Sequence, residues 1–435
     1  MRTFIAVVAL LAVLASRLFA ADTSYRDAAL DAARWIRASA VQSDQGTVWP
    51  ADPRDSKSVN DTLYAGTPGV VLFFIEAYRT TGDQSFLKDA RAGADHLLAI
   101  FANEKECGLY VGLAGVGFAL TETFKATGES RYRQGALRCA QLLGERATKA
   151  GKGIEWNETT DVIAGGAGIG LFLIYAAREL KEPAFSELAI RDAHRLIELG
   201  LPEETGIKWR MSPTFARLMP NFSHGTAGIA YFLATLFQET KKREFLDAAV
   251  AGAKYLQTVA KTDNEACLIF HNEPDGKDLY YLGWCHGPVG TARLFYRLYQ
   301  ITGDRAWMDW VKKSARGVME SGIPDKQTPG FWNNVSQCCG SAGVAEFFLN
   351  LHQVTPDRAY LDFSKRVTAQ LLAKATRDRE GMRWIQAEHR VRPEFLVAQT
   401  GYMQGAAGIG MLLLHLDSFQ RGKKASIKFP DSPFD

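Results

Sequence analysis

Residues 225–237 read GTAGIAYFLATLF, with two glycines three positions apart followed by a run that is apolar on nearly every side. The same pattern, G-x-x-G and then an apolar helical run, occurs seven times at spacings of 46 to 65 residues. The other six copies begin at Gly66, Gly112, Gly165, Gly287, Gly340 and Gly405. Because repeats of this length are typical of arrays and rings of similar units, this pattern decides the fold.

A second helical pattern with one charged face lies between successive copies, as in residues 131–146, RYRQGALRCAQLLGER, and 306–321, AWMDWVKKSARGVMES. Its apolar residues recur at intervals of three and four, which predicts an amphipathic helix. Counting residues 26–40 as the first such helix gives seven pairs. We therefore expect an all-α fold, an α/α toroid of seven helical hairpins over residues 22–420, with the glycine turns gathered at one end.

Short turns of the type T-G-D or T-P-D close several apolar helices, at Gly82-Asp83, Gly303-Asp304 and Pro356-Asp357. They predict a left-handed helix stop followed by the cap of the next helix. The stretch GGAGIG resembles a phosphate-binding loop, but no strand is expected before it and its glycines recur in every copy. Close packing at the starts of the apolar helices is the better explanation.

The N-terminal residues 1–21 have the pattern of a secretory signal peptide, with Arg2, an apolar run of 12 residues and small residues at Ala20 and Ala21. The run is too short to span a bilayer, which needs about 20 residues, so we expect no membrane span in the mature chain. The predicted location is secreted or periplasmic.

The formal net charge is +3, and loss of Arg2 and Arg17 with the signal leaves +1. Residues 421–435 form a basic C-terminal tail, but no basic run is long enough for a nucleic-acid or membrane surface. We expect neutral or zwitterionic partners, no nucleic acid, and a monomer.

The chain has six cysteines, at positions 107, 139, 267, 285, 338 and 339. A chain of this size does not need disulfides for stability, and the adjacent Cys338 and Cys339 would form a strained ring. When the seven copies are aligned on the first glycine, Cys285 and the Cys338-Cys339 pair occupy equivalent positions in copies five and six, which are neighbours in a ring. Three thiolates at about 2.3 Å with a fourth position open are typical of a catalytic zinc site; three buried free cysteines are the alternative.

His224 occupies the same position in copy four, next to the proposed metal site. Asp161 precedes the glycines of copy three, and a carboxylate near an imidazole orients it for proton transfer. We therefore assign His224 and Asp161 as catalytic residues, with helix capping as the alternative for Asp161. His286 is a possible fourth ligand or second proton donor. Packing or surface roles are expected for His96, His194, His352, His389 and His415.

At these residues the sequence resembles the lanthionine synthetase C-like family, whose fold is a seven-fold α/α toroid that holds one zinc ion. The family's W-C-x-G motif matches residues 284–287, and its C-H-G motif matches residues 338–340, with Cys339 in place of the histidine. The family's acid/base histidine matches His224, and its acidic residue matches Asp161. The resemblance implies zinc activation of a thiol and its addition to a dehydroalanine or dehydrobutyrine, with a peptide or small thiol as substrate.

Two other functions remain open from the residues. The first is a glycan-processing enzyme that draws its carboxylates from Glu155, Asp161, Glu273 or Asp275, because α/α toroids with aromatic residues can hold sugars. The second is a non-catalytic peptide-binding module, in which zinc is structural and His286 completes a closed site.

Overall fold

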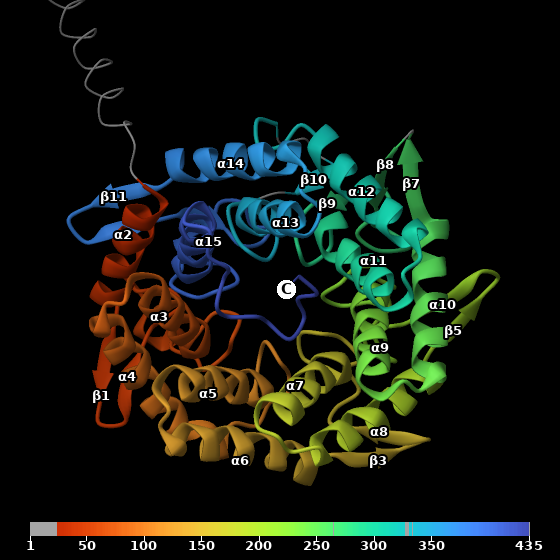
Figure 1. Cartoon of the computed structure of the whole chain (residues 1–435), viewed down its shortest axis with the longest axis horizontal. Helices are drawn as coiled ribbons and strands as arrows, with labels where there is room; N and C mark the ends of the chain where they lie inside the picture. The colour runs from red at the N-terminus through yellow and green to blue at the C-terminus, as the bar shows by residue number, and fades with distance from the viewer. Residues whose placement is uncertain (1–23, 264, 327–329, 333, 435) are drawn as a thin grey trace, which may run out of the picture.

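The computed structural model describes residues 24–434 except 264, 327–329 and 333. The chain forms two concentric rings of helices, as Figure 1 shows, and this confirms the predicted α/α toroid. The outer helices are α2 (Tyr25–Ala38), α4 (Gln84–Ile100), α6 (Ser130–Arg146), α8 (Ala184–Glu198), α10 (Arg243–Val259), α12 (Arg305–Glu320) and α14 (Arg358–Ala373). The inner helices are α3 (Thr67–Thr81), α5 (Leu113–Thr127), α7 (Gly166–Glu179), α9 (Thr226–Thr240), α11 (Pro288–Thr302), α13 (Ser341–Val354) and α15 (Ala406–Gln420). The predicted signal peptide, residues 1–21, lies outside the described residues.

The two ends of the helical chain close the ring. The first outer helix, α2, packs against the last inner helix, α15, and α15 also packs against α3. Every other outer helix packs against the inner helix that precedes it in sequence. Among the described residues, no helix combines the length and the apolar character that a membrane span requires.

Two of the three predicted left-handed helix stops are present, at Gly82 and Gly303. The third prediction was wrong: the C-cap of α13 is Thr355 with φ −137°, because a residue before a proline favours extended backbone. Gly82 has φ 78° in the left-handed region and ends α3, and the Asp83 side chain then accepts a hydrogen bond from the Ser85 backbone at the start of α4. The inner helices are buried along most of their length, because they are covered by the outer ring on one side and by each other on the flanks. Their nearly uniform apolar composition follows from this position.

Short β-hairpins, which we did not predict, follow five of the outer helices. They are β1 (Val41–Ser43) with β2 (Gly46–Val48), β3 (Thr148–Ala150) with β4 (Gly153–Glu155), β5 (Leu201–Glu203) with β6 (Gly206–Lys208), β7 (Ala260–Asp263) with β8 (Ala266–Ile269), and β11 (Thr376–Asp378) with β12 (Gly381–Arg383). Two further pairs, β13 (Ile385–Ala387) with β14 (Leu396–Ala398) and β9 (Tyr280–Tyr281) with β10 (Phe331–Trp332), lie near the glycine turns. Single turns of 3₁₀ helix occur at η1 (Ser56–Ser58) and η2 (Phe101–Asn103).

The turns that precede the seven inner helices are joined by a closed series of main-chain hydrogen bonds, which we call the turn belt. The N–H groups of Tyr64, Tyr110, Val162, Ser223, Cys285, Cys338 and Met403 donate over 2.8 to 3.1 Å to the carbonyls of Tyr110, Ile163, Ser223, Cys285, Cys338, Met403 and Tyr64, respectively. Each turn therefore donates to the next copy, and the bond from Met403 to Tyr64 closes the circle. The belt pairs polar backbone groups that would otherwise be buried in the crowded ring without a hydrogen-bond partner.

The basic tail, which the sequence analysis separates from the toroid at residue 421, lies inside the inner ring (Figure 1). The Ser426 hydroxyl and the N–H groups of Ser426 and Ile427 donate to the buried carboxylate of Glu76 on α3. On the other side of the ring, the Nε1 of Trp284 donates to Oδ2 of Asp431 over 2.9 Å. The tail thus connects α3 with the turn that precedes α11.

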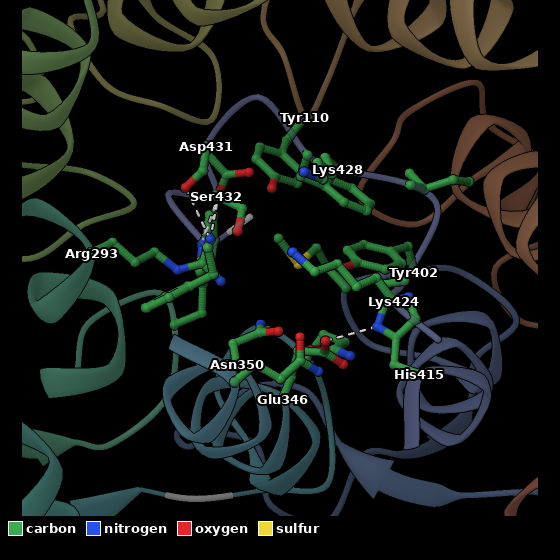
Figure 2. Close-up of a pocket in the computed structure, with 18 residues that line it drawn as sticks. Tyr110, Arg293, Glu346, Asn350, Tyr402, His415, Lys424, Lys428, Asp431 and Ser432 are labelled. Carbon is green, nitrogen blue, oxygen red and sulfur yellow. Dashed lines mark hydrogen bonds and ion pairs between the residues drawn. The ribbon is translucent and has the colours of Figure 1, made fainter. Parts of the chain in front are cut away.

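Figure 2 shows this part of the ring, where tail residues such as Lys424 and Asp431 lie among side chains of the inner helices. They surround a small cavity of about 70 Å³. His415 on α15 contacts Glu346 on α13 there, with Nδ1 2.7 Å from the carboxylate. Several tail residues, among them Ile427, Asp431 and Phe434, are therefore part of the packed interior of the toroid, whereas Lys424 and Lys428 are exposed.

Candidate functional site

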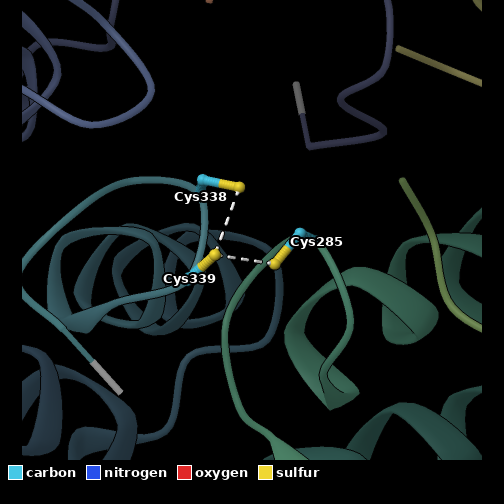
Figure 3. Close-up of side chains that lie close together, drawn as sticks. All are labelled: Cys285, Cys338 and Cys339. Carbon is cyan, nitrogen blue, oxygen red and sulfur yellow. Dashed lines mark hydrogen bonds between the residues drawn. The ribbon is translucent and has the colours of Figure 1, made fainter. Parts of the chain in front are cut away.

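The three predicted metal ligands lie together at the end of the ring that carries the glycine turns. The Cys285 and Cys339 Sγ atoms are 3.2 Å apart and those of Cys338 and Cys339 are 3.5 Å apart. All three sulfurs lie within 4.8 Å of one another and are buried. Figure 3 shows the three side chains close together. Among the described residues, this is the one cluster of histidine, cysteine and acidic side chains with the spacing of a metal site.

The turn belt explains why these sulfurs meet. Cys285 and Cys338 occupy equivalent positions in neighbouring copies, and the Cys285 N–H donates to the Cys338 carbonyl over 3.0 Å. A Cβ added to Gly283 would lie 2.8 Å from the Cys338 carbonyl oxygen, so only glycine allows the two turns to approach this closely. The main chain therefore sets the separation of the sulfurs.

The cluster fits a soft divalent ion. A tetrahedral site with Zn–S bonds of about 2.3 Å places sulfurs roughly 3.8 Å apart, close to the separations observed here. Hydrogen bonds from the Cys285 and Cys339 thiols hold the pKa of Cys338 well below its usual value, whereas burial raises the pKa of Cys285. If Cys285 and Cys339 are thiolates as well, the buried cluster carries two more negative charges, and these require a cation to balance them.

The two predicted catalytic residues are in direct contact. His224 Nδ1 lies 2.6 Å from Oδ2 of Asp161, and the other Asp161 oxygen accepts hydrogen bonds from the backbone N–H groups of Ala164 (2.7 Å) and Gly165 (2.9 Å). Asp161 therefore caps the start of α7 and orients His224 at the same time. Burial by itself lowers the pKa of His224, but the hydrogen bond and the charge of Asp161 outweigh it, so the net shift is upward.

His286 lies in a stack of rings beside the sulfur cluster. Its imidazole is parallel to that of His271, with centroids 4.0 Å apart at 7°, and its centroid is 5.5 Å from that of His224. Burial and the neighbouring imidazoles hold the pKa of His286 well below its usual value. Burial also lowers the pKa of His271, to about 4. Both rings are therefore neutral near pH 7, and the cysteine cluster does not include His286.

A cavity of about 670 Å³ opens over the three sulfurs, His224 and His286. Its walls also include side chains to which the sequence analysis gave no functional role, among them Tyr64, His271, Tyr281, Arg390 and Gln404. His389, which we assigned to packing or surface, also lines this cavity. The positions of Tyr64 and Gln404 just before the glycines of copies one and seven were the signal that could have identified these two.

Comparisons with known proteins agree with this arrangement. Residues 57–431 match the family described as lanthionine synthetase C-like protein. A curated relative from Danio rerio, named glutathione S-transferase LANCL1, is 21% identical over 318 residues, which cover 72% of this chain and 73% of that protein.

The solved structure of nisin cyclase shows the same fold. Nisin cyclase has a TM-score of 0.64 at 15% identity, with 93% of this chain and 96% of that chain covered. The GH76A α-1,6-mannanase of Salegentibacter sp. HEL1_6 is less similar, with a TM-score of 0.47 at 14% identity and coverage of 90% and 98%. The match to the family extends from the first inner helix to the tail inside the ring. This chain, with its clustered thiols and its toroid of seven hairpins, belongs to the lanthionine synthetase C-like family.

Proposed function

We propose that this protein is a zinc-dependent enzyme that adds a thiol to a dehydrated residue of a peptide and so forms a thioether. One observation carries the proposal: the cluster of Cys285, Cys338 and Cys339 and the pair of His224 and Asp161 face the same cavity. Family membership supports it, and the names of the two most informative relatives suggest a peptide and a small thiol as substrates.

Zinc is the ion that three cysteine ligands with a free fourth position suit best. When bound, it favours the thiolate form of an incoming thiol at neutral pH. The burial of all three sulfurs supports a site from which bulk water is excluded.

His224 is placed to move the proton. It accepts the proton that the substrate thiol loses, while Asp161 holds Nδ1 and leaves Nε2 directed to the cavity. The sulfur then forms a bond to the β-carbon of the dehydrated residue, and the π electrons move to the neighbouring carbonyl oxygen. Return of the proton from His224 to the α-carbon completes the thioether, so no oxidant or reductant is needed.

Tyr281 and Arg390 are the groups best placed to stabilise the enolate oxygen. Both line the cavity, and the Tyr281 hydroxyl interacts with the Arg390 guanidinium. Burial raises the pKa of Tyr281, so the hydroxyl remains a hydrogen-bond donor at neutral pH. Donors fixed in advance at a developing negative charge lower the activation barrier.

None of the four carboxylates considered for glycan processing is free of a charged or imidazole partner in the described structure. Asp161 is held by His224, and three other side chains of the proposed set are paired with cations: Glu155 with Arg195 at 2.9 Å, Glu273 with Lys208 at 3.3 Å, and Asp275 with Arg217 at 2.8 Å. Hydrolysis of a glycoside needs one carboxylic acid and one available carboxylate on either side of the bond. These contacts therefore favour thiol addition.

A direct test uses the zinc-loaded protein and a synthetic peptide with one dehydroalanine and one cysteine. A second assay offers a dehydroalanine peptide together with glutathione. Mass spectrometry after treatment with iodoacetamide distinguishes thioether from free thiol. We expect faster thioether formation in at least one assay than with His224→Ala. If both proteins give equal rates in both assays, or if the chain folds with full stability and binds no zinc, the proposal is wrong.

A second experiment, on the cobalt-loaded protein, separates an enzyme from a peptide-binding module. Cobalt in place of zinc reports coordination by its visible spectrum, and an open site changes that spectrum when a thiol is added. A closed four-ligand site leaves the spectrum unchanged.

We further propose that the chain acts outside the cytoplasm, on the basis of residues 1–21. Metal binding would then also protect the neighbouring sulfurs from oxidation. N-terminal sequencing of the exported protein tests this location, since a mature chain should begin close to residue 22.

A further inference from the structure

The inner helices carry a polar residue at one repeat position, in contrast to the apolar residues around it. The tenth residue after the first glycine is polar in all seven copies, for example Glu76, Tyr175, Thr235 and Arg297. These four side chains are buried. Because ten residues along a helix correspond to about 15 Å, this level of the ring lies well away from the turns that carry the sulfurs.

Arg297 on α11 is a buried cation with no carboxylate partner among the described residues. Its Nη1 donates to the side-chain oxygens of Gln238 and Gln300 over 2.7 and 3.1 Å, and its Nη2 donates to the Tyr231 hydroxyl over 3.0 Å. All three acceptors are neutral, and Nε has no acceptor in the described part of the chain. Of the five N–H groups of the guanidinium, one on Nε and one on Nη2 are therefore left for a ligand.

Arg297 lines a cavity of about 90 Å³ between α7, α9, α11 and the tail, which are neighbours in the ring of Figure 1. Thr235 on α9 lines the same cavity, and its buried hydroxyl also has no hydrogen-bond partner among the described residues. Two adjacent copies of the repeat thus direct unused donors to one place.

The charges around this cavity are mostly positive. Arg178 and the exposed Lys428 line it together with Arg297, and Glu239 is the one carboxylate among its lining residues. Arg178 is paired with Glu179 at 3.1 Å. With that pair set aside, two cations face one carboxylate, and the buried one of the two is Arg297.

The chemistry of the walls selects the occupant. Water would complete both hydrogen bonds but would leave the guanidinium charge unbalanced, and a buried unbalanced charge is costly. A small oxyanion accepts the hydrogen bonds and neutralises the charge at the same time. The volume of about 90 Å³ is several times the 10–15 Å³ or so that one water molecule needs, so it has room for an anion of phosphate size.

We propose that Arg297 and Thr235 form a binding site for a small oxyanion, a phosphate or a carboxylate group, in the interior of the toroid and apart from the sulfur cluster. The guanidinium and the hydroxyl hold its oxygens, and the exposed Lys428 adds positive charge at the rim. Because Lys428 and Ser432 belong to the tail, the bound anion ties the tail to α9 and α11. The site takes no part in thiol addition, so this inference stands or falls independently of the proposed function.

The test measures binding of inorganic phosphate and of acetate to the zinc-loaded protein by isothermal titration calorimetry at constant ionic strength. Thr235→Val keeps the shape of the side chain but removes the hydroxyl, and it should weaken binding about tenfold, the effect of one hydrogen bond to a charged group. Arg297→Gln removes the charge as well as the two N–H groups and should weaken binding about a hundredfold.

Thr123→Val is the matched control. Thr123 is also buried on an inner helix, but its hydroxyl already donates to the Ala119 carbonyl over 2.8 Å. This variant should bind both anions as the wild type does. Anions bound at the zinc would likewise be unaffected by any of the three substitutions.

Hydrogen–deuterium exchange gives an independent readout, because phosphate should slow exchange in tail residues 428–432. Tighter binding of phosphate than of acetate would identify a phosphate site, and equal binding would identify a site for carboxylates as well. The proposal is wrong if neither anion binds to the wild type. It is also wrong if Thr235→Val, which remains decisive where Arg297→Gln does not fold, binds both anions as tightly as the wild type.

Discussion

The N–H of Cys285 donates to the carbonyl oxygen of Cys338 over 3.0 Å, so main chain already joins the two turns that carry the sulfurs. Their side chains need little reorganisation to surround one ion, and such preorganisation increases affinity. The proposed metal site thus depends on the same hydrogen bond that every copy of the repeat makes with its neighbour.

The cysteine cluster predicts a clear effect of single substitutions on metal content. Cys285→Ala should reduce bound zinc from equimolar to almost none, as measured by elemental analysis. Because metal bound only to the folded chain contributes about 2.7 kcal/mol at a hundredfold excess over its Kd, the thermal midpoint should also fall.

Cys267→Ala is the control for that experiment. Cys267 is buried on β8 but lies outside the cluster. The Cys267→Ala variant should keep its zinc. Loss of metal from this variant would show that metal binding depends on general packing.

The pair of His224 and Asp161 predicts a change in catalysis with no change in metal content. His224→Ala should reduce the rate of thioether formation by about 10²- to 10⁴-fold, the usual range for a general acid or base. Asp161→Asn removes the charge that raises the pKa of His224, so the acidic limb of the pH–rate profile should move to lower pH. Asp275→Asn, which also lines the cavity, should leave that limb in place.

His415 predicts a pH dependence of stability. Burial opposes its charged form, but the charges of Glu346 and Glu76 raise its pKa to about 9. Because the pKa is raised in the folded state, the charged imidazole stabilises the fold fully below the unfolded pKa of about 6.5. This stabilisation is lost as pH rises through about 9.

Urea unfolding should therefore show a difference between wild type and His415→Gln that is larger at pH 6 than at pH 10, by roughly 2–3 kcal/mol. His352→Gln is the control for loss of an imidazole, because half-buried His352 bonds to the backbone carbonyl of Asp357 and has no carboxylate partner among the hydrogen bonds and ion pairs of the described residues. A difference that is constant with pH would mean that His415 is not charged in the folded chain.

The contact of Asp431 with Trp284 predicts that the tail contributes to the stability of the ring. Asp431→Ala leaves the buried Trp284 Nε1 without its acceptor, and an unpaired buried donor costs about 1–3 kcal/mol. Trp284→Phe removes the donor, so the double variant should lose less than the sum of the two single variants in urea unfolding. Simple additivity would indicate that the contact carries no energy.

The repeat made most of this molecule predictable from sequence. Seven equivalent glycine turns fixed the fold, and equivalent positions before Gly287 and Gly340 were enough to bring Cys285 and Cys338 together. Asp161 and His224, which the structure shows in contact, were assigned in the same way, since each lies just before the glycines of its copy, and their catalytic role stays a prediction. Periodic patterns work here because every copy meets its neighbours in the same geometry.

The features that escaped prediction depend on contacts between unlike parts of the chain. The hairpin strands are mostly three residues long, too short for an alternating pattern to be recognised. Tyr64 and Gln404 come from opposite ends of the sequence and meet only because the ring closes. His271 lies on no repeat position at all, and the place of the tail is set by side chains such as Trp284 and Glu76.

The pairing of α2 with α15 has a consequence for biosynthesis. Among the described helices, the one that leaves the ribosome first, α2, packs against the one that leaves last, α15. The ring therefore cannot close until α15 has been synthesised. Export through a narrow translocon requires an incompletely folded chain, and this order of assembly is compatible with that requirement.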